Sequence, residues 1–63
     1  MNVKIDYAAL AQANTESAEF HVNLARQYLE AGNFTMALYH KNIAHQIADA
    51  NWKVIAKMLE EAL

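Results

Sequence analysis

Three histidines are the residues of this chain best suited to chemistry, because imidazole binds metal ions and exchanges protons near neutral pH. They are His21, His40 and His45. His40 and His45 are five residues apart, about 500° around a helix, so their rings diverge from any shared ligand. No His-x-x-x-His or Glu-x-x-His pair occurs. We therefore interpret the histidines as packing or surface residues and predict no metal site, with a pH-sensitive interface as the alternative.

Groups that could catalyse a reaction are scarce. Ser17 is the only serine, and the residues around it include no plausible base. Glu60 and Glu61 are adjacent, so they project in different directions from a helix and are expected on the solvated surface. We predict that the chain is not an enzyme and uses no cofactor.

The composition favours helices and excludes several classes of site. Hydrophobic residues, many of them alanine, make up 56% of the 63 residues, with one glycine and no proline. Without cysteine, neither disulfides nor thiolate zinc sites can form. The formal net charge of −2 and the lack of a Lys/Arg run argue against nucleic acid, and no apolar run approaches the ~18 residues of a membrane span. A cytoplasmic protein that gains stability from self-association or a larger partner is expected.

The periodicity of apolar residues predicts an all-α fold, a small helical bundle built on an antiparallel helical hairpin. We expect three to four helices in a single domain spanning residues 1–63. They are predicted at about residues 6–13, 16–31, 34–48 and 52–63. Breaks are expected at Asn14-Thr15, where Thr15 would cap the second helix, and at Asp49-Ala50-Asn51. One continuous helix through residues 14–15 is the alternative.

The central turn is the clearest local signal. Gly32 is predicted just after a helix end, where a positive φ suits glycine, and Asn33 is predicted to cap the next helix. Asp6 is expected to cap the first helix. So short a connection makes the flanking helices antiparallel neighbours.

Residues 18–51 resemble a single tetratricopeptide-like helical hairpin, whose repeat has the same length of 34 residues. The residues at that family's spacings are Leu24, Ala25, Tyr28, Gly32, Phe34, Ala37 and Ala44. In this resemblance the alanines let the helices approach, and Tyr28 and Phe34 fill the wedge between them. The sequence departs from the family at His21, Lys41 and Asp49. A weaker resemblance, carried by Gly32-x-Phe34-x-x-Ala37-Leu38, is to microtubule-interacting-and-trafficking (MIT) domains.

The resemblance implies a module that binds proteins or peptides and does no chemistry. Some tetratricopeptide proteins hold a carboxylate end with Lys, Asn and Arg on the first helix. Asn23 and Arg26 lie on the corresponding outward side and are candidate binding residues, although the lysines are missing.

A contact surface is also predicted from the residues themselves. Tyr39, Ile43 and Ile47 form a row at helical spacing, and Trp52 follows. Aromatic anchors beside aliphatic residues suit a protein interface. Packing inside the monomer is the alternative interpretation.

These observations predict a small protein–protein interaction module, adaptor or inhibitor, a homodimer with a further protein partner, and possible origin in a bacterium or phage. A dimeric nucleic-acid-binding regulator and a purely structural self-assembling unit are the alternatives. The helix-turn-helix pattern fits poorly, because Ala25 and Gly32 are seven residues apart and the following helix carries Met36, Tyr39 and Ile43 instead of a basic reading face.

Overall fold

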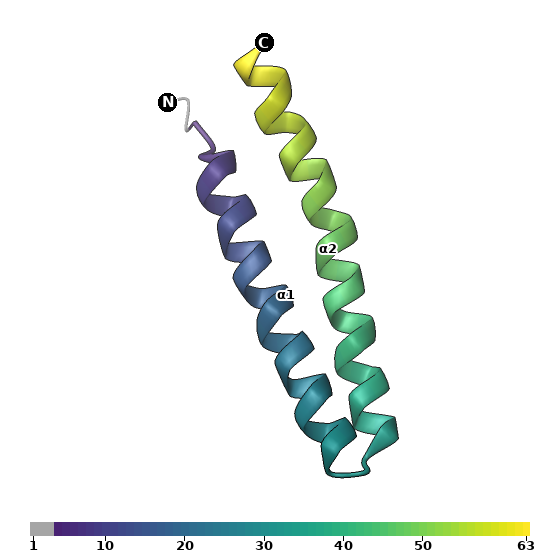
Figure 1. Cartoon of the computed structure of the whole chain (residues 1–63). Helices are drawn as coiled ribbons and strands as arrows, with labels where there is room; N and C mark the ends of the chain where they lie inside the picture. Colours follow the sequence, from purple (N-terminus) through teal and green to yellow (C-terminus); the bar gives the residue numbers. More distant parts are fainter. Residues whose placement is uncertain (1–3) are drawn as a thin grey trace.

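The computed structural model describes residues 4–63 and consists of two long α-helices joined by a tight turn. Helix α1 spans Tyr7–Glu30 and helix α2 spans Phe34–Ala62. The helices lie antiparallel and side by side, so the start of α1 and the end of α2 meet at the end opposite the turn (Figure 1). Together they form a rod of 49 × 20 × 14 Å. The predicted all-α class and helical hairpin are confirmed.

The prediction of three to four helices is wrong. The expected helices at 6–13 and 16–31 are one helix, and those at 34–48 and 52–63 are another. Thr15 caps nothing, because its hydroxyl donates to the carbonyl of Ala11 one turn earlier in the same helix. Asn14 and Asn51 do not break their helices either, since their side chains bond to each other across the hairpin.

The helix ends follow the sequence signals closely. The carboxylate of Asp6 accepts from the backbone N–H of Ala9, and the amide oxygen of Asn33 accepts from that of Met36. Gly32 has a φ of +78°, where a side chain would be strained. The N–H groups of Gly32 and Asn33 donate to the carbonyls of Leu29 and Tyr28, which closes α1 with a Schellman motif. The predicted caps at Asp6 and Asn33 and the glycine turn are confirmed.

The core is a single seam between the two helices. The residues of this seam are buried or half-buried and recur at alternating spacings of three and four, the pattern of a coiled coil. On α1 they are Tyr7, Ala11, Asn14, Ala18, His21, Ala25 and Tyr28, and on α2 they are Ala37, His40, Ala44, Ile47, Asn51, Val54 and Met58.

Small residues face large ones along most of this seam. The Asn14–Asn51 contact sets the antiparallel register, and in that register Ala25 lies opposite His40 and Tyr28 opposite Ala37. His21 likewise lies opposite Ala44. This alternation lets two helices approach closely while each layer stays filled.

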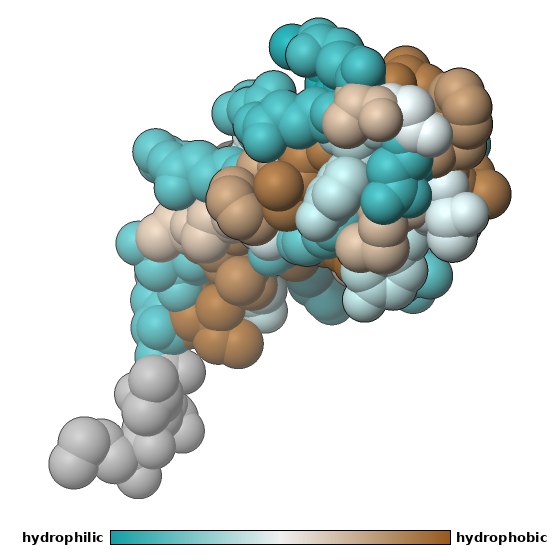
Figure 2. Space-filling model, turned by 90° about the horizontal axis from the view of Figure 1, so that it is seen from below, coloured by the Kyte–Doolittle hydropathy of each residue, from teal (hydrophilic) through white to brown (hydrophobic). Residues whose placement is uncertain are grey.

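Burial is slight for a folded chain. Within residues 4–63, the buried residues are Ala11, Ala44 and Asn51, and no large side chain is fully buried. Hydrophobic surface therefore reaches the outside between hydrophilic patches, as the view from the turn end shows (Figure 2). Phe34, expected in the wedge between the helices, is 68% exposed, because its place beside the turn lies off the seam. That expectation is wrong, whereas Tyr28 is half-buried in the seam.

Candidate functional site

Two polar clusters interrupt the seam, and the first is built from asparagines. The Asn51 amide nitrogen donates to the carbonyl of Ala11 at 3.1 Å and to the hydroxyl of Thr15 at 3.3 Å. The Asn51 carbonyl oxygen accepts from the amide of Asn14 at 3.0 Å. Among the described residues, no buried side-chain nitrogen or oxygen lacks a partner. We name Ala11, Asn14, Thr15 and Asn51 the asparagine cluster.

The second polar cluster is a pair of histidines from opposite helices. The Nδ1 atoms of His21 and His40 lie 2.9 Å apart, and the ring centroids lie 5.1 Å apart. The nitrogens are closer than atoms of stacked ring faces, which pack at about 3.5 Å or more, so the rings meet edge to edge. One ring must donate its Nδ1 proton to the lone pair of the other. We name His21 and His40 the histidine pair.

Aromatic rings surround the histidine pair. Tyr28 stacks on His40 with centroids 5.6 Å apart. Phe20 and Tyr39 place their rings edge-on against His21 and His40, at 5.4 and 5.1 Å. Phe20 and Tyr39 each contact the histidine that follows them in the chain, and both remain more than half exposed.

One face of the hairpin carries a long apolar groove. Near the turn it is a hollow of about 520 Å³, lined by Val22, Ala25, Arg26, Leu29, Phe34, Ala37, Leu38 and Lys41. Val22 also borders a second hollow of about 270 Å³, which extends along the hairpin past Glu19 to Trp52 and Ile55. Ala25 and Ala37 belong to the seam, and their small side chains leave room for the first hollow. We name this surface the groove face.

The opposite face carries a more compact apolar patch. Val22 and Lys41 of the groove face each follow a seam histidine, so Phe20 and Tyr39, which precede those histidines, point to the other side. The same helical positions place Leu24, Met36 and Ile43 there, and these three are half-buried. We name Phe20, Leu24, Met36, Tyr39 and Ile43 the Tyr39 patch.

The structure separates the residues predicted as one contact surface. Tyr39 and Ile43 belong to the Tyr39 patch, whereas Ile47 is half-buried in the seam. Trp52 lies on the groove face and is 69% exposed. Tyr39, Ile43 and Ile47 are spaced by four residues. Because 3.6 residues make a helical turn, residues at that spacing move gradually around the helix and leave a single face.

Asn23 and Arg26 are both exposed on α1, as their outward placement predicted. Arg26 borders the groove beside Lys41 of α2. Asn23 lies on the side of α1 away from the seam, so the structure does not bring it together with Arg26 in one hollow.

Sequence reasoning missed the asparagine cluster, the histidine pair and the groove. The spacing of Tyr7, Ala11, Asn14, Ala18 and His21, alternately four and three, would have revealed the continuous seam. Polar side chains at such positions are the signal for hydrogen bonds between helices.

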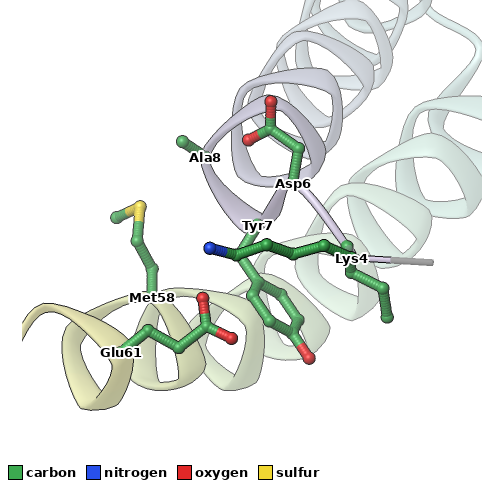
Figure 3. A pocket seen from close by; sticks show the side chains of 7 residues that line it. Lys4, Asp6, Tyr7, Ala8, Met58 and Glu61 are labelled. Carbon is green, nitrogen blue, oxygen red and sulfur yellow. The ribbon is translucent and has the colours of Figure 1, made fainter. Parts of the chain in front are cut away.

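A further hollow of about 370 Å³ lies at the end opposite the turn. Figure 3 shows Met58 and Glu61 of α2 facing Lys4 and Tyr7 at the start of α1. Within the described part of the chain, no three His, Cys, Asp or Glu side chains gather closely enough to hold a metal ion. Over the same residues, neither helix contains a stretch long and apolar enough to cross a membrane.

Comparison of the chain with protein-family models, curated proteins and solved structures gives no match. The functional argument accordingly rests on geometry: a thin polar-interrupted seam flanked by two apolar faces. Such an arrangement offers surfaces for contact with other helices.

Proposed function

We propose that this chain is a protein-interaction module that binds a partner protein through its helix faces and performs no chemistry itself. One observation carries the proposal. Eleven large hydrophobic side chains are exposed, whereas the buried hydrophobic residues of the described chain are two alanines. Exposed apolar surface concentrated on faces, in place of scattered single residues, is typical of contact sites.

The Tyr39 patch is the surface best suited to a foreign protein. Phe20 and Tyr39 offer large exposed rings, and Leu24, Met36 and Ile43 surround them with half-buried apolar groups. Aromatic side chains contribute strongly at interfaces. Each ring also makes an edge-on contact with the adjacent histidine, and contacts that restrict a side chain before binding lower the entropy cost of an interface.

The resemblance to a tetratricopeptide hairpin, and more weakly to MIT domains, supports the same class of function. Hairpins of that kind bury their apolar faces against neighbouring helices, because two helices alone cannot cover them. A second copy of the chain and a different protein are both partners of this kind.

The test is capture with matched variants. The immobilised full chain is exposed to a lysate of its source cells, with a photo-crosslinking amino acid in place of Met36 of the Tyr39 patch in every variant. We expect one protein to crosslink and to be lost in a Phe20→Ser/Tyr39→Ser variant. The control is Gln46→Ser, two turns from Tyr39 on the same face.

Two outcomes would contradict the proposal. Recovery of nucleic acid, with proteins lost after nuclease treatment, would favour the regulator alternative. Capture that is unchanged by Phe20→Ser/Tyr39→Ser would remove the Tyr39 patch as the contact surface.

A further inference from the structure

The groove face differs from the Tyr39 patch in its length. Along α2 its apolar residues are Phe34 and Leu38 near the turn and Ala48, Trp52, Ile55 and Leu59 in the far half, with Lys41 and His45 between the two groups. The opposite face is apolar mainly near the turn, and farther along it carries Leu10 among Ser17, Gln46 and Lys53. Apolar residues toward both ends of one helix face are what a bundle helix shows toward a second neighbour.

From these two apolar groups, with exposed Trp52 in one and the hollow near the turn in the other, we infer that a second copy of the chain covers the groove face, antiparallel to the first, and inserts Trp52 into the hollow of its partner. The inference rests on the proposed function in one respect, that the exposed helix faces are contact surfaces. It names the occupant of one of them.

The groove face contains both a projecting ring and a hollow that can receive one. Trp52 is 69% exposed and stands beside Ile55. The hollow of about 520 Å³ has an alanine floor and apolar walls from Val22, Leu29 and Leu38. Each copy has one ring and one hollow. Two copies related by a two-fold axis therefore make the contact between ring and hollow twice, once in each direction.

The spacing of the ring and the hollow matches this symmetry. Leu38, His45 and Trp52 lie on the same side of α2, seven residues apart, so about 21 Å separates Leu38 from Trp52. A two-fold axis across the rod at His45 places Trp52 of each copy over Leu38 of the other. Because His45 lies near the middle of the hairpin, the two rods then overlap along most of their length.

The size of the face is sufficient for a stable dimer. Standard interfaces bury roughly 800 Å² on each partner. The rod is 49 Å long and 20 Å wide, and its whole surface is 5115 Å². Covering one broad face therefore reaches that area and converts the two-helix seam into a four-helix bundle with a thicker core.

Trp52 is the only tryptophan, so its fluorescence reports directly on the proposed contact. With increasing concentration of the full chain, we expect the emission to shift to shorter wavelength as sedimentation shows a dimer. Trp52→Ala should raise the dimer dissociation constant by roughly thirtyfold or more. Gln46→Ala, at an exposed position on the opposite face, is the control and should leave dimerisation unchanged. Circular dichroism checks that each variant remains helical.

Crosslinking tests the axis independently of Trp52. The chain has no cysteine, so a single His45→Cys substitution lies beside its own copy across the axis and should form a disulfide-linked dimer on mild oxidation. Gln46→Cys, on the opposite face, should not.

Each alternative outcome overturns the inference in a distinguishable way. A dimer with unshifted Trp52 emission and crosslinking only at residue 46 places the second copy on the Tyr39 patch, so the inference fails and the interaction function stands. A chain that stays monomeric yet captures a different protein also overturns only the inference. A monomer that captures no protein overturns both.

Discussion

The two polar clusters of the seam use similar groups under different rules. In the asparagine cluster, the side-chain oxygen of Asn51 can only accept and its nitrogen can only donate. Asn51 is only 6% exposed. In the histidine pair, the bond depends on which ring holds the Nδ1 proton, and both rings are half-buried. The comparison teaches that a buried amide can fix the register of the helices with assigned donors and acceptors, whereas a half-buried ring pair holds them together only through the placement of one proton.

The largest effect is expected at the asparagine cluster. Asn51→Ala leaves the amide of Asn14 without its acceptor and opens a gap in the seam, so the free energy of unfolding should fall by about 1 to 3 kcal/mol. Chemical denaturation at fixed protein concentration measures this change in unfolding free energy. Asn42→Ala, an exposed asparagine of the same helix, is the control. An equal loss of unfolding free energy in Asn51→Ala and Asn42→Ala would show that the asparagine cluster does not stabilise the fold.

A smaller effect is expected at the histidine pair. His40→Ala removes the 2.9 Å bond to His21 and the stacking on Tyr28, but solvent can reach the site. We expect a loss of roughly 0.5 to 1.5 kcal/mol, measured by the same denaturation. Gln46→Ala, at an exposed position of α2 outside the seam and the groove face, should change stability little. A loss larger than that of Asn51→Ala would reverse the ranking of the two clusters.

The smallest change in stability is expected when both asparagines become apolar. Asn14→Leu/Asn51→Leu removes both partners together, so unfolding free energy should stay within about 1 kcal/mol or rise. The variant should select its helix register and oligomeric state less strictly, because a polar pair in a seam favours one register. Native mass spectrometry should show a broader set of assemblies than the wild-type chain. A single unchanged species would show that the alanine and large-residue layers alone set the register.

Local signals in the sequence predicted the helix ends correctly. Asp6, Gly32 and Asn33 act within a few residues of themselves, through caps and a positive φ, so their roles can be inferred without knowing the rest of the fold. The same local reasoning failed at Asn14, Thr15 and Asn51. Asparagine and threonine are equally suited to end a helix or to bond within and between helices, and only the neighbouring helix decides which use wins.

The sequence by itself thus determined that this chain is helical, that it turns back at Gly32, and that it has more apolar surface than two helices can bury. Only the tertiary structure decided that the helices are two, that Asn14 meets Asn51 and His21 meets His40, and that Tyr39 and Trp52 lie on opposite faces. The physical reason is range. Caps and turns depend on neighbours in sequence, whereas faces and pairs depend on a register set between residues more than thirty positions apart.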